Sequence, residues 1–262
     1  MIEVQNVSKQ YQLTKKQQKE LHTNAASIFA VKNVSFTCKP GSVFSLLGAN
    51  GAGKTTLLRM IATILTPTEG DILVSGQSVL THSQKVRKSI GFLTGSTNLY
   101  DRLTPGEIVQ YFADLHGIHK TLFEQRKDDL FTQLGIHEFS KKRISQMSTG
   151  MKQKVSIARS MIHNPNVVIF DEPTSGLDVI TANSIIQLIK QCKQEGKTVI
   201  FSSHIMSEVD LLCDDLAIIN KGQLIYNDTM ANFRTQHAHQ SLTEAFINIV
   251  HKGEKLGIRN KE

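Results

Sequence analysis

The chain has little of several features that mark particular protein classes. Its 262 residues contain no tryptophan and only 3 cysteines, Cys38, Cys192 and Cys213, which are widely separated and without CxxC spacing. An odd number of scattered cysteines argues against a disulfide framework and against a zinc site. No apolar run reaches the roughly 18 residues of a membrane-spanning helix, and the first residues lack a signal-peptide layout. We therefore expect the chain to stay in the cytoplasm.

The residues that are present have the composition of an ordinary globular protein. Hydrophobic residues make up 40% and charged residues 20%, with no low-complexity tract, so we expect one compact folded unit. The net charge of +7 suits nucleic acid, an anionic membrane surface or simple solubility, and does not choose among them. The basic clusters at residues 15–16 and 141–143 lack interleaved aromatic residues. We interpret them as solvated faces and expect no nucleic-acid partner.

Apolar residues near the N-terminus predict two strands of an antiparallel flap. The first strand candidate, residues 1–11, carries Ile2, Val4 and Val7. The second, residues 31–38, has apolar residues at alternate positions and ends before a Pro-Gly pair. The polar stretch between them, residues 12–27, is predicted to be an exposed excursion.

Further apolar segments predict an α/β core. Residues 43–47 form an apolar run that leads through a Gly-rich loop into residues 55–65, whose apolar residues recur at helical spacing. Other strand candidates lie at residues 72–74, 90–93, 167–170, 198–201 and 216–219. The last of these continues as a hairpin into residues 223–226.

Between residues 93 and 167 the apolar period becomes helical, which predicts an inserted helical segment. Thr104, Pro105 and Glu107 are start signals, because Thr104 can cap the helix and Glu107 can close a capping box. The predicted apolar face of this helix consists of Ile108, Tyr111, Phe112 and Leu115. A second helix is marked by Leu130, Phe131 and Leu134 and ends at Gly135. A C-terminal helix with Leu242, Ala245, Phe246 and Ile249 on one face is expected to pack onto the core, with residues 251–262 loose.

The Gly-rich loop fits the pattern G-x-x-x-x-G-K-[ST] of a phosphate-binding P-loop. Its residues are Gly48, Ala49, Asn50, Gly51, Ala52, Gly53, Lys54 and Thr55. The loop follows a buried strand and opens a helix, so its backbone N–H groups and the helix N-terminus favour phosphate oxygens. Lys54 supplies positive charge, and the Thr55 hydroxyl is a candidate Mg²⁺ ligand. Together with Thr56, these residues are the predicted ATP-binding loop, and an accidental Gly-rich turn is the weaker interpretation.

The apolar strand at residues 167–170 ends in two adjacent carboxylates, Asp171 and Glu172. In nucleoside triphosphatases a carboxylate at this place holds Mg²⁺, and we assign that role to Asp171. Adjacent residues leave a strand end in different directions, so Glu172 is the candidate base that polarises an attacking water. Two such carboxylates are more often solvated turn residues, but the P-loop upstream favours the catalytic interpretation.

Other motifs resemble the ATP-binding cassette (ABC) family. The helix start formed by Ser148, Thr149, Gly150 and Met151 resembles the signature motif of that family. The segment Ser175, Gly176, Leu177 and Asp178 resembles its D-loop, and His204, after two serines, resembles its switch histidine. Tyr11 stands where the family stacks an aromatic ring on adenine. The resemblance covers nearly the whole chain, with the motifs in the family's order.

The resemblance implies a fold and an activity. The implied fold is a P-loop NTPase core of the RecA-like kind, with an antiparallel β flap and an inserted α-helical subdomain. Residues 1–94 and 163–226 would form the catalytic lobe with its flap, residues 95–162 the helical signature subdomain, and residues 227–262 the C-terminal helix and tail. The implied activity is hydrolysis of ATP with Mg²⁺, in which Lys54, Glu172 and His204 act at the γ-phosphate.

The resemblance also implies partners. In the family two cassettes pair head to tail, so we expect a second ABC ATPase subunit, as a homodimer when ATP is bound. Ser148 heads a helix, which makes an anion site aimed away from the chain's own P-loop. A cassette without a membrane span implies a separately encoded transmembrane permease. The chain would then be peripheral on the cytoplasmic face of the cell membrane, with residues 98–117 docking the permease.

Some positions depart from the family pattern. After the strand at residues 90–93 the family has a glutamine, where this chain has Gly95, and Thr94, Ser96, Thr97 or Asn98 are alternative sources of an oxygen. In the signature, Thr149 and Met151 stand where the family usually has glycine and glutamine. These departures resemble the sodium-extruding subgroup of the NatA type. That subgroup implies export of sodium, or of another small cation or drug.

Two other functions compete with the transporter hypothesis. A soluble cassette acting on nucleic acid or ribosomes would carry a long coiled coil between P-loop and signature, or two joined cassettes, and this sequence has neither. A regulatory cassette that binds ATP without turnover is disfavoured because Lys54, Asp171, Glu172 and His204 are all present.

Overall fold

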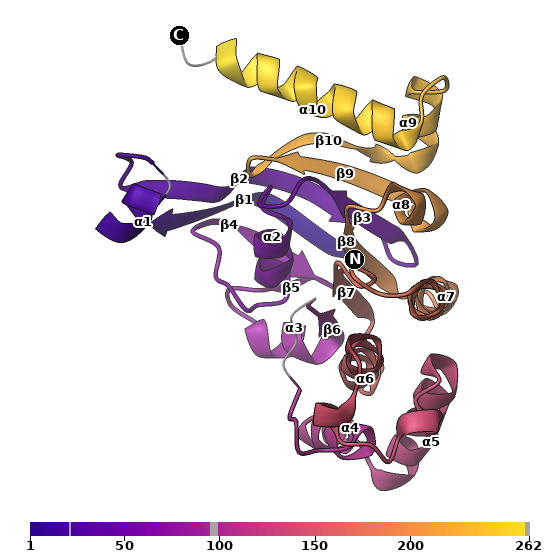
Figure 1. Ribbon diagram of the computed structural model, residues 1–262. Coiled ribbons are helices and arrows are strands. Elements are labelled where there is room, and N and C mark those ends of the chain that lie inside the picture. Colours follow the sequence, from indigo (N-terminus) through magenta and orange to yellow (C-terminus); the bar gives the residue numbers. More distant parts are fainter. Residues whose placement is uncertain (21, 95–98, 260–262) are drawn as a thin grey trace.

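Two β-sheets lie at the centre of the computed structural model, which describes residues 1–20, 22–94 and 99–259 (Figure 1). The first sheet has the strand order β2-β1-β4-β5. Its strands are β1 (Ile2–Gln12), β2 (Ser27–Cys38), β4 (Glu69–Val74) and β5 (Gln77–Ser78), and all pairs are antiparallel. The predicted flap is therefore confirmed, with two differences: β2 begins at Ser27 rather than at residue 31, and residues 72–74 belong to the flap.

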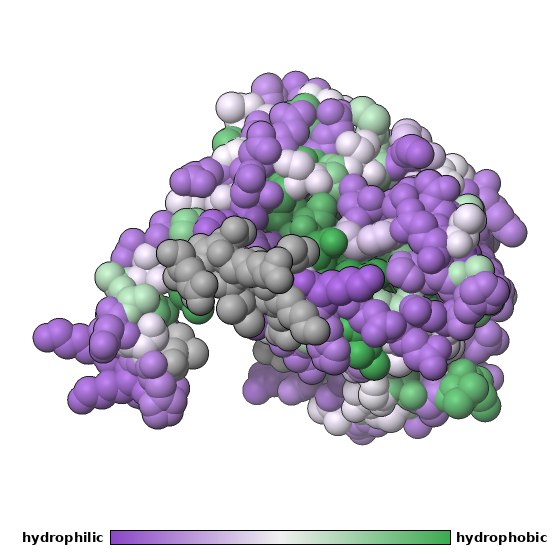
Figure 2. All heavy atoms as spheres, turned by 90° about the horizontal axis from the view of Figure 1, so that it is seen from above, coloured by the Kyte–Doolittle hydropathy of each residue, from purple (hydrophilic) through white to green (hydrophobic). Residues whose placement is uncertain are grey.

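The polar excursion between β1 and β2 projects from this flap (Figure 1). It contains the short helix α1 (Lys15–Glu20), which has no buried residue. Figure 2 shows the projecting part at the left edge with a hydrophilic tip. Hydrophilic side chains cover most of the face seen in Figure 2, and hydrophobic ones gather in a hollow beside the residues drawn in grey. The prediction of an exposed excursion is confirmed.

The second sheet has the strand order β10-β9-β3-β8-β7-β6. Its strands are β3 (Val43–Leu47), β6 (Ile90–Leu93), β7 (Val167–Asp171), β8 (Thr198–Ser203), β9 (Asp215–Asn220) and β10 (Gln223–Thr229). All neighbours are parallel except β9 and β10, which form the predicted hairpin. Parallel strands end at the same edge of a sheet. This edge therefore brings together the Gly-rich loop, Thr94, Glu172 and His204.

Apolar residues from the two faces of this sheet pack into separate cores. On β3, Phe44 and Leu46 pack toward the flap and α2 (Lys54–Ile61), whereas Val43 and Leu47 pack toward the helices on the other face. Because both faces are covered, β3, β7 and β8 are buried along their whole length. Helix α2 ends at Ile61, whereas the sequence predicted that it would continue to residue 65, and Ile64 is 57% exposed.

The inserted segment contains α4 (Pro105–Leu115), α5 (Lys120–Leu134) and α6 (Thr149–Met161), with 3₁₀ turns η1 (His137–Phe139) and η2 (Ile144–Gln146) between the last two. Thr104 and Glu107 form the predicted capping box, and Gly135 ends α5 with φ +63°. The predicted apolar face of α4 is partly wrong. Ile108, Val109 and Ala113 are buried, but Tyr111 and Leu115 are 47% and 65% exposed. The buried side of α4 is the one that packs with α5 and α6.

The remaining helices are α3 (Ser83–Ser89), α7 (Val179–Gln194), α8 (Met206–Leu212), α9 (Met230–Gln236) and α10 (Leu242–Arg259). Leu242 and Ala245 are buried as predicted, but α10 runs to Arg259, so residues 251–259 are helical and not a loose end as predicted, and residues 260–262 lie outside the described residues. The helix packs on β10 as far as Gly253, where an added Cβ would lie 3.4 Å from Ile225 Cγ2. None of the helices in the described part of the chain combines the length and apolar character needed to cross a bilayer.

Candidate active site

The Gly-rich loop connects β3 to α2 through two positions that only glycine fits well. Gly53 has φ +110°, and a Cβ there would lie 2.4 Å from the Ala30 carbonyl oxygen. A Cβ at Gly48 would lie 2.4 Å from the Ile219 carbonyl oxygen. The glycines thus allow the loop to pass close to the backbone of β2 and β9. This close approach fixes the loop in front of the N-terminus of α2, as the P-loop pattern predicts.

Lys54 is buried at the centre of the loop and is only 4% exposed. Its Nζ donates hydrogen bonds to the carbonyl oxygens of Gly48 at 2.7 Å and Ala49 at 3.1 Å. The same nitrogen lies 3.7 Å from Glu172 Oε1. Burial lowers the pKa of Lys54, and the nearby carboxylates of Glu172 and Asp171 oppose that shift. The loop therefore holds a cation where the sequence predicts phosphate binding.

Asp171 and Glu172 point in different directions from the end of β7. Asp171 is 6% exposed, and its Oδ1 accepts a hydrogen bond from Ser202 Oγ at 2.7 Å. Glu172 has φ +49°, and its N–H donates to the Ser202 carbonyl oxygen at 3.2 Å and to Ser202 Oγ at 3.0 Å. A positive φ at a non-glycine residue is uncommon and marks a constrained position. Ser202, on the neighbouring strand β8, thus orients both acidic residues.

His204 follows β8 and lies beside the second carboxylate. Its Nδ1 is 3.4 Å from Glu172 Oε2, so the Glu172 carboxylate lies between Lys54 and His204. The His204 side chain is 47% exposed and the Glu172 side chain 27%. The structure therefore brings together three residues that the sequence places far apart.

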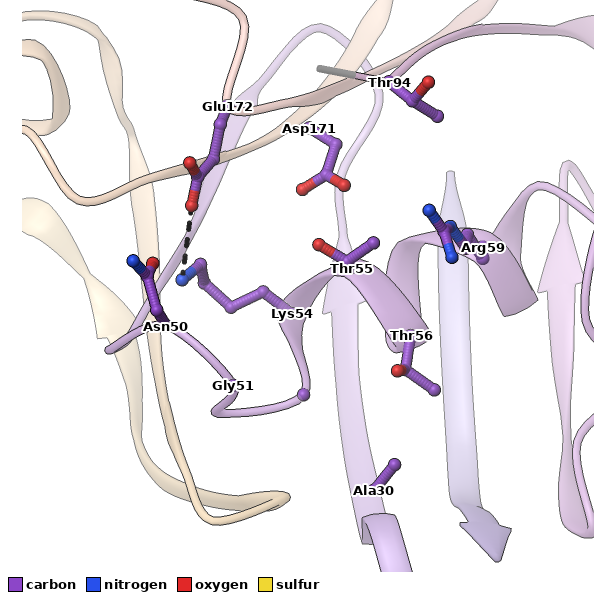
Figure 3. Close-up of a pocket in the computed structure, with 11 residues that line it drawn as sticks. Ala30, Asn50, Gly51, Lys54, Thr55, Thr56, Arg59, Thr94, Asp171 and Glu172 are labelled. Carbon is purple, nitrogen blue, oxygen red and sulfur yellow. Dashed lines mark ion pairs between the residues drawn. The ribbon is translucent and has the colours of Figure 1, made fainter. Parts of the chain in front are cut away.

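Lys54, Asp171 and Glu172 line a cavity of about 530 Å³, whereas His204 is not among its lining residues. It is lined by Ala30, Asn50, Gly51, Gly53, Lys54, Thr55, Thr56, Arg59, Thr94, Asp171 and Glu172. Figure 3 shows the Asp171 carboxylate facing the Thr55 hydroxyl across this cavity. Arg59 and Ala30 were not among the site residues predicted from the sequence, although Arg59 lies one helical turn after Thr55. Gly95, Ser96, Thr97 and Asn98 lie outside the described residues, whereas Thr94 lines the cavity.

The predicted signature residues 148–151 are not among the residues that line the cavity. Ser148 caps α6, and its Oγ accepts a hydrogen bond from the Met151 N–H at 3.3 Å. A Cβ at Gly150 would lie 3.3 Å from Thr181 Oγ1, so the signature lies against the start of α7. Asp178 caps that helix by accepting hydrogen bonds from the Thr181 N–H at 2.9 Å and from Thr181 Oγ1 at 2.8 Å. These two bonds lower the pKa of Asp178. The signature and D-loop segments are therefore neighbours within one chain.

Tyr11 lies near the end of β1, opposite Ile28 on β2. Its side chain is 38% exposed, and Lys9 Nζ lies 5.5 Å from the centre of its ring. Tyr11 is not among the residues that line the cavity, so adenine stacking by this ring stays a prediction.

The chain is similar to known proteins over most of its length. The ABC transporter family matches residues 31–175, and an AAA domain family matches residues 141–210. The ABC transporter ATP-binding protein NatA of Bacillus subtilis (strain 168) is 42% identical over 225 residues, which are 86% of this chain and 92% of that protein. The linearmycin resistance ATP-binding protein LnrL of the same organism is 32% identical over 230 residues, 88% of this chain and 74% of that protein.

Solved structures agree with these matches. An ATP-binding subunit of an ABC transporter superimposes with a TM-score of 0.82 at 25% identity, covering 95% of this chain and 99% of that one. A dimeric post-hydrolysis state of an ATP-binding cassette bound to ADP and Pi gives a TM-score of 0.77 at 26% identity, covering 88% and 99%. These likenesses confirm the predicted fold. The chain belongs to the ABC transporter family, as one of its ATP-binding and ATP-hydrolysing cassettes.

Proposed function

We propose that the cavity beside the Gly-rich loop binds ATP by its phosphates and that Glu172 is the base for hydrolysis. The observation that carries this proposal is the position of the Glu172 carboxylate, 3.7 Å from Lys54 Nζ and 3.4 Å from His204 Nδ1. A water attacking the γ-phosphate needs a proton acceptor at that end of the cavity. Lys54 exchanges its loop carbonyl partners for phosphate oxygens, and His204 contacts the γ-phosphate.

The outer part of the same site holds the rest of the nucleotide. The N-terminus of α2 and the backbone N–H groups of residues 51–56 face the phosphates, where the helix dipole favours negative charge. Tyr11 stacks on the adenine ring, because it is an exposed aromatic residue of the flap and Ala30 of the same sheet lines the cavity.

Thr55 and Asp171 fit a magnesium ion. Mg²⁺ prefers oxygen ligands and is commonly held by one or two protein groups together with substrate phosphates and water. The Asp171 carboxylate faces the Thr55 hydroxyl (Figure 3), and Ser202 fixes its orientation through the 2.7 Å hydrogen bond to Oδ1. When bound there, Mg²⁺ neutralises charge on the phosphate oxygens. Asp171 and Thr55 would hold the ion and so orient the nucleotide in the cavity.

The base assignment is tested by Glu172→Gln. The amide keeps the size of the side chain but is a poor proton acceptor, so we expect ATP binding near wild type and hydrolysis lower by about 10²-fold or more. Binding is measured with a fluorescent nucleotide and hydrolysis by phosphate release. Glu124→Gln, at an exposed ion pair with Lys127, is the matched control and should leave both unchanged. Steady-state turnover near wild type in Glu172→Gln would contradict the assignment.

We also propose that the working unit is a homodimer in which residues 148–151 of one copy complete the cavity of the other. The support is geometric: the cap of α6 offers an anion site, yet these residues do not line the chain's own cavity. A similar cassette forms a dimer in its post-hydrolysis state. Residues 175–178 lie against the signature and would face the same partner. ATP bound between two copies favours the closed state, because it contacts both.

The dimer would act on a separately encoded membrane permease, peripheral on the cytoplasmic face of the cell membrane. The support is the kinship with transporter ATP-binding proteins, one of which is named for resistance to linearmycin. We propose export of a small cation such as sodium, or of a drug, with residues 98–117 docking the permease. The test is purification of the tagged protein from its native membranes in mild detergent. A stoichiometric multi-span partner supports this role, whereas ribosomes or a DNA complex would contradict it.

A further inference from the structure

A buried glutamate outside the cavity joins two loops of the site. Glu208 lies on α8 and is 7% exposed. Its Oε2 accepts one hydrogen bond from Thr174 Oγ1 at 2.8 Å and another from Ser203 Oγ at 3.1 Å. Thr174 and Ser203 are themselves 4% and 3% exposed. Two segments that are distant in sequence are therefore held to one oxygen atom.

The two hydroxyl groups belong to opposite sides of the Glu172–His204 contact. Thr174 follows Glu172 by two residues, and its carbonyl oxygen accepts from the Leu177 N–H at 3.2 Å within the D-loop segment 175–178. Ser203 directly precedes His204, and its Oγ also accepts from the Ile205 N–H at 3.0 Å. The loop after β8 is thus fixed on both sides of His204. Glu208 itself does not line the cavity.

Packing alone does not call for an acidic residue at this position. Glu208 shares its buried side of α8 with Val209 and Leu212, and a Leu or Met would fill similar volume without burying a polar group. A hydrogen bond accepted by a carboxylate is stronger than one between two neutral groups. Removing Glu208 would therefore leave the buried hydroxyls of Thr174 and Ser203 without their acceptor. The specific property that glutamate adds is a common anchor for Thr174 and Ser203.

We propose that Glu208 is a positioning residue that couples the D-loop segment to the loop carrying His204. The proposal rests on the proposed roles of Glu172 and His204. A displacement of residues 175–178 reaches Thr174 and then, through Glu208, reaches Ser203 and the histidine beside the γ-phosphate. Since we place the D-loop segment at the surface of a second copy, Glu208 makes the position of His204 depend on closure of the dimer.

The test compares Glu208→Leu with Glu208→Gln. The leucine removes the acceptor, so we expect kcat to fall about tenfold while KM for ATP stays within about twofold. The glutamine keeps a carbonyl oxygen for the hydroxyls and should recover kcat to within about threefold of wild type. Asp210→Asn, on the same helix at a half-exposed ion pair with Arg234, is the matched control and should keep wild-type kcat. If the role of Glu208 were purely structural, Glu208→Leu would have a lower melting temperature but would not combine a lower kcat with an unchanged KM.

A double-mutant cycle tests whether Thr174 and Ser203 are coupled through Glu208, and it also covers the case in which Glu208→Leu fails to fold. Thr174→Val and Ser203→Ala each remove one hydroxyl, and each should lower kcat about threefold. If both hydroxyls act only through their common anchor on Glu208, losing either one already breaks the coupling, so the double variant Thr174→Val/Ser203→Ala should lower kcat by clearly less than the product of the two separate effects. Fully multiplicative effects, or unchanged kcat in all of these variants, would overturn the proposal. If Glu172→Gln loses turnover while these variants keep it, only the coupling by Glu208 fails.

Discussion

The nucleotide cavity and the signature surface, defined as residues 148–151 and 175–180, are built in opposite ways. In the cavity, Lys54 and Asp171 are 4% and 6% exposed and are held by hydrogen bonds to the loop and to β8. On the signature surface, Val179 and Ile180 are 85% and 80% exposed. Both regions begin a helix with a group that can meet an anion, but only the cavity surrounds that group with other parts of the same chain. The difference is what we expect if, as proposed, the cavity is a finished half-site and the signature surface is a half-site that needs a second copy.

The largest expected effect comes from breaking the finished half-site at Gly53. In Gly53→Ala the new Cβ meets the Ala30 carbonyl oxygen at 2.4 Å in a backbone with φ +110°, so the loop must move. We expect the Kd for ATP to rise about 10²-fold or more, measured by fluorescent nucleotide titration. Gly76→Ala is the control: its φ is +76° and a Cβ there has no neighbour within 4 Å, but Gly76 is not among the residues that line the cavity. Equal losses in both variants would show that the close approach to Ala30 does not matter.

The next effect comes from the signature cap. Ser148→Ala should leave ATP binding to the isolated chain unchanged but lower kcat about tenfold or more, because the hydroxyl is proposed to act on the other copy's nucleotide. Loss of the cap also lowers the free energy of unfolding by about 1 kcal/mol. Thr229→Ala removes the equivalent cap of α9, where Thr229 accepts from the Asn232 N–H at 3.1 Å. It should show the same loss of stability with normal kcat.

A smaller effect is expected at the exposed apolar pair. Ile180→Lys should weaken ATP-dependent dimerisation about tenfold, as measured by analytical ultracentrifugation, because a charge would be buried between the copies. The stability of the isolated chain should change by no more than about 0.5 kcal/mol, since the side chain is 80% exposed. Ile247→Lys, at a 44% exposed position on α10, is the control and should dimerise normally.

The smallest effect is expected at His163, where the helical segment meets β6, because it concerns the pH dependence of stability and not ATP turnover. His163 stacks on His116 with ring centres 3.9 Å apart, and its Nε2 lies 3.1 Å from the Ile90 carbonyl oxygen. Burial lowers the His163 pKa from 6.5 to about 4. A folded pKa below the unfolded one means that this stabilisation is complete above pH 6.5 and is lost as pH falls toward 4.

The matching variant removes the titration at this junction. His163→Gln should flatten the fall in unfolding free energy between pH 7 and pH 5 by about 1 kcal/mol, allowing for partial solvent exposure. Chemical denaturation at each pH measures this slope. His239→Gln, at an exposed histidine, should keep the wild-type slope. An unchanged slope in His163→Gln would contradict the account of this contact.

Local signals in the sequence predicted much of this molecule. The capping box at Thr104 and Glu107, the turn at Gly135 and the strand–loop–helix unit at the P-loop depend on residues close in sequence, and all occur. The buried face of α4 was misassigned because apolar spacing allows more than one face, and the positions of α5 and α6 decide between them. The contacts of Ser202 and Glu208 could not be predicted, because they depend on which strands and helices become neighbours.

In the proposed dimer one chain carries two halves of different sites, and a mixing experiment tests this claim most directly. Lys54→Ala removes the cation of the cavity, and Ser148→Ala removes the hydroxyl of the signature. Each protein alone should therefore hydrolyse ATP poorly. In a mixed dimer the cavity of the Ser148→Ala chain faces the intact signature of the Lys54→Ala chain. An equimolar mixture should therefore recover up to about a quarter of wild-type turnover, since half of randomly paired dimers contain one intact site of two. Turnover no higher than the mean of the two separate proteins would contradict the claim.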